Sequence, residues 1–144
     1  MIWKHSLPAL LTLAVLGSCG PAPATQLTEI DRALSQRRYT EARDALLVLR
    51  KQDANSIETV RRLAKVELEL EDGYSAERYL DEWRAITGET PEWVTHRARA
   101  LILQRRARFA RDFLEQAKPA ETEAEQRAWL LVWALMEERQ FEKA

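Results

Sequence analysis

Apolar residues recur at helical spacing along most of the chain, from about Gln26 to the last residue. Leu, Ile, Val, Ala and aromatic side chains lie three or four positions apart with charged residues between them, which is the pattern of amphipathic helices. Glycine and proline are few and runs of β-branched residues are scarce, so strands are not expected. The pattern predicts an all-α fold with helices near 26–37, 39–52, 56–71, 74–87, 91–105, 107–117 and 122–138, and an eighth helix that begins near Phe141.

Capping residues support several of these boundaries. Thr90 precedes Pro91 at one predicted helix start, where the missing N–H of proline does no harm. Gly88 suits the end of the preceding helix. Two further pairs have the spacing of a capping box, namely Asn55 with Glu58 and Thr122 with Glu125.

The helical pattern also repeats along the chain. Four small residues occupy equivalent positions at one constant interval, and a leucine lies one helical turn after each of the first three. These residues are Ala42, Ala76, Ala110 and Ala144, followed by Leu46, Leu80 and Leu114. A small residue lets two paired helices approach closely, and the larger side chain fills the space beside it. The sequence therefore predicts helical pairs of one size.

Two helices in 34 residues are the signature of the tetratricopeptide repeat, and the chain resembles that family from about Gln26 to its end. The resemblance implies an α-solenoid, an array of antiparallel helix pairs with about three and a half repeats over residues 26–144. The family pattern places an aromatic residue three positions before each small residue. Tyr39 and Phe141 fit this pattern, whereas Gly73 and Ala107 stand at the other two places. A generic array of helical hairpins is the alternative.

The fourth repeat holds a first helix and only the start of a second one. A lone first helix leaves apolar surface uncovered where natural arrays place a polar cap. The sequence is therefore interpreted either as part of a longer array or as a chain whose last helix is covered by a partner.

The part of the chain before Gln26 has a different pattern. Residues 7–16 are apolar apart from Thr12, and they follow a short start that carries Lys4, which is the layout of an export signal. The apolar run is too short to cross a bilayer, because a spanning helix needs about 20 apolar residues. Residues 1–18 are predicted to be a signal peptide.

The stretch from Leu16 through Gly17 and Ser18 to Cys19 resembles the lipobox of bacterial lipoproteins. This resemblance implies that Cys19 is lipidated and becomes the mature N-terminus. Gly20, which follows it, favours the outer membrane on its periplasmic side, with the inner membrane as the alternative. Residues 19–25 hold two prolines and are expected to form the lipidated Cys and a flexible linker. An ordinary signal peptide with a chance cysteine is the other interpretation.

Composition gives no support for an enzyme. The net charge is −1 with acids and bases interspersed, so a nucleic-acid partner is not expected. His5 and His96 are the two histidines and Cys19 is the single cysteine, which leaves no usual metal site, catalytic triad or cofactor motif. His96 is interpreted as a plain surface or groove residue, and the acidic residues between 67 and 71 as a solvated face.

A partner-binding groove is predicted from the family resemblance, because the first helices of successive repeats line the concave face of such arrays. The repeat register places Arg61 and Lys65 there from the second unit, Arg99 from the third, and Trp129 and Trp133 from the fourth. The cations could meet carboxylates or peptide carbonyls, and the two indoles could anchor apolar side chains. Burial of both tryptophans in the core is the alternative.

The sequence thus predicts a membrane-anchored scaffold that binds a protein or peptide in the periplasm, without a cofactor or a metal. Proteins of similar architecture act in envelope, pilus or polysaccharide-export assembly. The alternative is a structural spacer or anchoring subunit that has no ligand in the groove.

Overall fold

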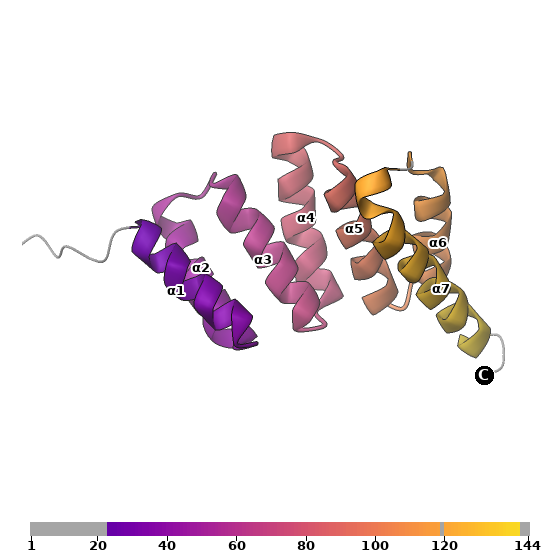
Figure 1. Ribbon diagram of the computed structural model, residues 1–144, viewed down its shortest axis with the longest axis horizontal. Helices are drawn as coiled ribbons and strands as arrows, with labels where there is room; N and C mark the ends of the chain where they lie inside the picture. The colour runs from indigo at the N-terminus through magenta and orange to yellow at the C-terminus, as the bar shows by residue number, and fades with distance from the viewer. Residues whose placement is uncertain (1–22, 119, 142–144) are drawn as a thin grey trace, which may run out of the picture.

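The computed structural model describes residues 23–118 and 120–141, and all the regular structure in this part of the chain is helical. The elements are α1 (Pro23–Ser35), α2 (Tyr39–Gln52), α3 (Ile57–Glu69), α4 (Gly73–Thr87), α5 (Pro91–Leu103), α6 (Ala107–Gln116), the short 3₁₀ helix η1 (Glu121–Glu123) and α7 (Ala124–Phe141). Figure 1 shows the helices in one row along the long axis, with α1 at one end and α7 at the other. The all-α prediction is confirmed.

The helices pack as consecutive hairpins. A three-residue turn joins α1 to α2, α3 to α4 and α5 to α6, and the two helices of each hairpin contact each other. Each hairpin also contacts the next element along the chain, through α2 with α3, α4 with α5, and α6 with α7. We call α1, α3, α5 and α7 the first helices, and α2, α4 and α6 the second helices. Among the first helices, α3 contacts α5 and α5 contacts α7.

The three hairpin turns share one backbone geometry. The N–H of Arg37, Glu71 or Arg105 donates to the carbonyl three residues earlier, and the next N–H donates to the carbonyl five residues before it. The same three residues have positive φ angles of 57°, 59° and 63°. This combination is the Schellman motif, which satisfies carbonyl groups left free at a helix C-terminus. The motif recurs at the same interval as the small residues of the sequence repeat.

The core holds the small and large aliphatic positions that the repeat pattern selected. All six are fully buried, and they are Ala42, Leu46, Ala76, Leu80, Ala110 and Leu114. One core cluster extends from α1 to α5 and the second from α5 to α7. Trp93 and Phe113 meet edge to face with ring centroids 5.9 Å apart where these clusters adjoin. Trp93 also satisfies its indole N–H, which donates to the carbonyl oxygen of Leu80 at 2.8 Å.

Gly73 stands where the tetratricopeptide pattern has an aromatic residue, and the packing at this position leaves no room for a side chain. A Cβ atom at this position would lie 2.7 Å from the carbonyl oxygen of Ala100 and 2.9 Å from Cβ of Leu103. The start of α4 therefore approaches the end of α5 too closely for any side chain. Gln104 spans the same contact, since its Nε2 donates to the carbonyl oxygen of Gly73 at 2.9 Å.

Two capping predictions are confirmed, whereas those for Asn55 and Thr122 are wrong. Thr90 caps α5, with its hydroxyl accepting from the N–H of Trp93, and Gly88 ends α4 with a φ of 77°. The cap of α3 is Ser56 rather than Asn55. The N–H of Asn55 instead donates to the side chain of Asp53, which forms a local turn and moves the helix start one residue along the chain.

Both ends of the described chain differ from the sequence prediction. Helix α1 begins at Pro23, ahead of the predicted start at Gln26, because proline is tolerated in a first helical turn. Thr122 lies within η1 and does not precede the first residue of α7 directly. Helix α7 continues through Phe141, so the break expected after residue 138 is absent there. After α1, α3 and α5, the helix ends in a turn, and the following second helix packs against it. The described residues hold no such second helix after α7.

Candidate partner-binding groove

The three cations predicted for the groove, Arg61, Lys65 and Arg99, are here called the cation strip. Arg61 and Lys65 lie on α3 and both bind the carboxylate of Glu92 at the start of α5. The Nζ atom of Lys65 is 2.6 Å from Oε1 of Glu92. Burial alone would raise the pKa of Glu92, but the hydrogen bonds and charges of Lys65 and Arg61 lower it overall. The structure therefore brings two predicted groove cations together on one carboxylate.

Arg99 completes the cation strip from α5. Its Nη1 atom lies 2.6 Å from Oε1 of Glu69, and its Nη2 donates to the carbonyl oxygen of Leu68 at 3.2 Å. The three cations are thus already paired with carboxylates of the same surface. Ion pairs that remain partly open to water contribute little, about 0–1 kcal/mol each, so a partner's carboxylate could exchange with them.

His96 lies next to the cation strip, and the sequence pattern did not predict its contact with Trp83. The imidazole meets the buried indole of Trp83 edge to face, with ring centroids 5.8 Å apart, while Arg61 lies 4.9 Å above the same indole. Its Nδ1 atom is buried and has no hydrogen-bond partner among the described residues. Burial, reinforced by the positive charge of Lys65, lowers the pKa of His96 to about 4. A neutral imidazole thus sits next to the cations at neutral pH.

A small hollow opens beside this cluster. Its volume is about 220 Å³, and its lining comes from α3, α4, the start of α5 and η1. The lining residues are Arg61, Trp83, Thr87, Thr90, Pro91, Glu92, Thr122 and Glu123. Pockets for whole cofactors or drug-sized ligands are usually larger, about 300–1,000 Å³. The hollow is therefore of a size for one side chain of a protein partner.

The two predicted aromatic residues lie together on α7. The rings of Trp129 and Trp133 meet at an interplanar angle of 66° with centroids 5.5 Å apart. Trp133 is half-buried against the second core cluster and donates to Oε1 of Glu137 at 3.4 Å. Trp129 is largely exposed. In the repeat register, Trp133 matches Lys65 and Arg99, which makes it the continuation of the cation strip.

A larger hollow of about 520 Å³ lies between α1 and α2, away from the cation strip. Ile30, Ala33 and Ala42 form apolar parts of its wall, and Arg38 and Glu41 contribute charged groups that pair with each other. No histidine or cysteine lines it, and nothing in its lining indicates catalysis.

Cys19, the predicted lipidation site, lies outside the described residues, as do the predicted signal peptide and the linker up to residue 22. Among the helices that the structure describes, none combines the length and the apolar character needed to cross a bilayer. Within the same residues, no group of three or more His, Cys, Asp or Glu side chains could hold a metal ion.

Comparison with known proteins gives no relative. No protein-family model matches the chain, and neither the curated proteins nor the solved structures contain a significant match.

Proposed function

We propose that this chain is a tetratricopeptide-type scaffold that binds a protein partner along the first helices. One observation carries the proposal: ion pairs join the first helix α1 to α3 and α3 to α5, and a further pair joins the turn after α5 to α7. The pairs are Asp31 with Arg62, Glu92 with Arg61 and Lys65, Glu69 with Arg99, and Glu137 with Arg105.

Backbone geometry favours the tetratricopeptide interpretation over a generic hairpin array. The Schellman turns at Arg37, Glu71 and Arg105 keep the period of the sequence repeat, and the three turns have equal length. Each hairpin also buries the same small and large pair at the same place in its second helix. Repeats that pack alike in this way stack with a constant rotation, which forms an extended concave surface.

The groove offers a defined chemistry to its partner. Lys65 and Arg99 can bind acidic side chains or main-chain carbonyls once Glu92 or Glu69 is displaced. The hollow beside Trp83 accepts a single side chain, and Trp133 supplies an apolar contact at the far end. An extended segment or a helix with acidic and apolar residues fits this sequence of contacts.

The scaffold is proposed to be held at the outer membrane, facing the periplasm, by a lipid on Cys19. Lasting attachment needs more than one acyl chain, because a single chain binds only marginally. Such a protein would serve envelope, pilus or polysaccharide-export assembly. A spacer subunit that binds through its ends and leaves the groove empty remains the competing proposal.

Site-directed cross-linking tests the groove. A photo-crosslinking amino acid is placed at position 65 on α3, and a matched one at position 108, which is exposed on the second helix α6. In the native cells, cross-links to one envelope protein are expected from position 65 and not from position 108. Cross-links from position 108 alone would contradict the groove and favour the spacer.

The captured partner then allows an affinity measurement. Arg99→Ala is expected to weaken binding about thirtyfold, the effect of losing an interface contact of about 2 kcal/mol. Arg108→Ala removes the same charge from α6 and should leave the affinity within about twofold. Circular dichroism of both variants controls for loss of fold. Equal affinities of the two variants would move the binding site away from the cation strip.

A further inference from the structure

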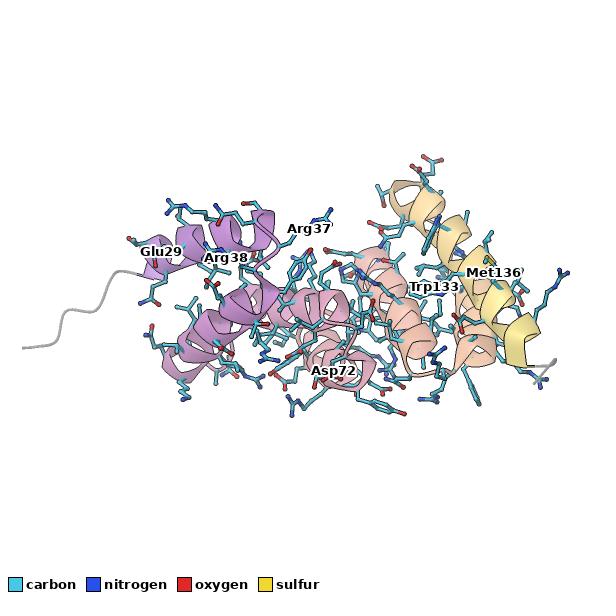
Figure 2. All side chains as sticks on the ribbon, turned by 90° about the horizontal axis from the view of Figure 1, so that it is seen from below. Glu29, Arg37, Arg38, Asp72, Trp133 and Met136 are labelled. Atoms are coloured by element: carbon cyan, nitrogen blue, oxygen red, sulfur yellow. The ribbon has the colours of Figure 1, made fainter. Side chains whose placement is uncertain are left out.

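One side of α7 carries an exposed apolar surface, here called the α7 stripe. Its residues recur three or four positions apart and include two adjacent pairs, so they line up along the helix. They are Glu125, Ala128, Trp129, Val132, Leu135, Met136 and Arg139, all exposed. The exposed fractions of the large members are 64% for Trp129, 57% for Val132, 46% for Leu135 and 58% for Met136. Figure 2 shows α7, with Met136 labelled, at the end of the molecule opposite α1.

The corresponding surface of α5 is covered within the molecule. The positions one repeat earlier than the four large members are Thr95, Ala98, Leu101 and Ile102, and their exposed fractions are 2%, 0%, 5% and 2%. Helices α6 and α7 pack on α5, and Ala98, Leu101 and Ile102 belong to the core cluster that the three helices share. The α7 stripe is thus the kind of surface that α5 buries against its neighbours.

The sequence of α7 is apolar around its whole circumference in this region. Residues 129–136 form an uninterrupted apolar run. The inner side packs on α5 and α6 through Leu130 and Ala134, both buried. A helix that is apolar on every side is normally buried on every side, and an exposed apolar patch of this kind marks an interaction surface.

We propose that the α7 stripe binds the α7 stripe of a second copy of this chain, with the two helices antiparallel and the twofold axis at Val132. This register sets residues at equal distances on either side of Val132 opposite each other. The facing pairs are Glu125 with Arg139, Ala128 with Met136, and Trp129 with Leu135 of the second copy.

Complementarity of charge and of size supports this arrangement over a parallel one. An acid faces a base at both ends of the contact, whereas a parallel pair would place Glu125 against Glu125 and Arg139 against Arg139. The small Ala128 lies opposite the long Met136, so the side chains interdigitate. A twofold contact is closed, which limits the assembly to a dimer. The dimer contact uses α7 alone, whereas Lys65 and Arg99, the cations of the proposed function, lie on α3 and α5.

Sedimentation of the full chain tests the dimer. The chain carries Cys19→Ser so that no disulfide links two copies, and it is measured from about 5 µM to about 500 µM, the range of modest helix contacts. We expect a monomer–dimer equilibrium within that range. Val132→Glu, which places two like charges on the twofold axis, should yield a monomer at every concentration while circular dichroism stays unchanged. A monomeric parent chain, or a Val132→Glu variant that still dimerises, would overturn the proposal.

A charge exchange tests the antiparallel register. Glu125→Arg alone and Arg139→Glu alone each set like charges opposite each other, so each should dimerise at least tenfold more weakly than the parent. In a parallel register the parent and both variants would all set like charges opposite each other, so neither single variant would weaken the dimer, and an equimolar mixture of the two would dimerise more tightly than the parent. In the antiparallel register, each facing pair of the mixed dimer is again opposite in sign, and dimerisation should return to within about threefold of the parent. A mixture as weak as the separate variants would overturn the register.

Discussion

The imidazole of His96 lies edge-on against the indole of Trp83, with 5.8 Å between the ring centroids and Lys65, Arg99 and Arg61 around it. Burial and these cations hold the pKa of His96 at about 4, below its ordinary value of 6.5, although the carboxylate of Glu92 acts in the opposite direction. The unfolded chain therefore binds a proton at higher pH than the folded chain does. The contribution of His96 to the free energy of unfolding is fully present above about pH 6.5 and is lost as the pH falls towards 4.

We expect the free energy of unfolding to fall by about 2–3 kcal/mol between pH 6.5 and pH 4 because of this residue. His96→Gln, which carries no titrating group, should remove that part of the pH dependence. Urea unfolding of both chains at several pH values measures it. If the free energy of unfolding depends on pH equally in the variant and in the parent, His96 protonates as easily in the folded state as in the unfolded one.

Gly73→Ala tests the close approach of α4 to α5. The new Cβ atom would meet the carbonyl oxygen of Ala100 at 2.7 Å, and a backbone atom cannot move away cheaply. We expect a loss of about 1–3 kcal/mol in the free energy of unfolding, as is usual for overpacking. Tyr74→Ala changes the adjacent, exposed residue and should alter stability by about 0.5 kcal/mol or less. Equal effects of the two substitutions would contradict the steric account.

Glu67→Gln tests a buried carboxylate that the sequence pattern assigned to a solvated face. Burial raises the pKa of Glu67, and the positive charge of Arg43 offsets only part of this rise. The folded state therefore favours the protonated form of Glu67, and the stability that this form provides is lost as the pH rises through the raised pKa. The neutral amide of the variant should therefore raise the melting temperature at pH 7 relative to the parent, with a smaller gain at pH 4. Glu71→Gln, at an exposed position, is the control.

Glu71→Gly tests the left-handed turn at the end of α3. A side chain at a φ of 59° is strained, and glycine at this position of a Schellman motif is not. Part of the relief is offset by the greater freedom of glycine in the unfolded chain, so a gain of about 0.5 kcal/mol is expected. Arg108→Gly, in the first turn of α6, should instead cost up to about 1 kcal/mol. Chemical denaturation of both variants distinguishes the two signs.

Cys19→Ser tests the proposed lipid anchor. The variant should leave the membrane pellet and lose incorporation of labelled palmitate, since two or more acyl chains provide the lasting attachment. Membrane retention together with labelling in the variant would exclude this anchor.

Local signals in the sequence predicted several helix boundaries to the residue. The bounds of α2, the start of α5 and the end of α4 follow from periodicity, from Thr90 before Pro91, and from Gly88. The repeat spacing located the fully buried positions of the second helices, such as Ala76 and Leu80. These features depend on residues close in sequence, which is why the sequence alone was sufficient.

Features that depend on distant residues were not predicted. The hairpin turns carry no glycine or asparagine at their left-handed residue, so nothing at Arg37 or Arg105 indicated a Schellman motif. His96 is half-buried because Trp83 of another helix packs against it. The cation strip was predicted as a row of charges, and its pairing with Glu92 and Glu69 depends on how α3 and α5 lie side by side.

The described helices lie in one row, and each substantial contact between them joins neighbouring hairpins or two helices of the same hairpin. No central core therefore ties together the two ends of this part of the chain. Such a chain can open from either end while the middle remains folded, and amide protons of α4 and α5 should exchange with solvent more slowly than those of α1. Its contacts are close in sequence, so folding does not wait for distant segments to meet and is expected within microseconds to milliseconds.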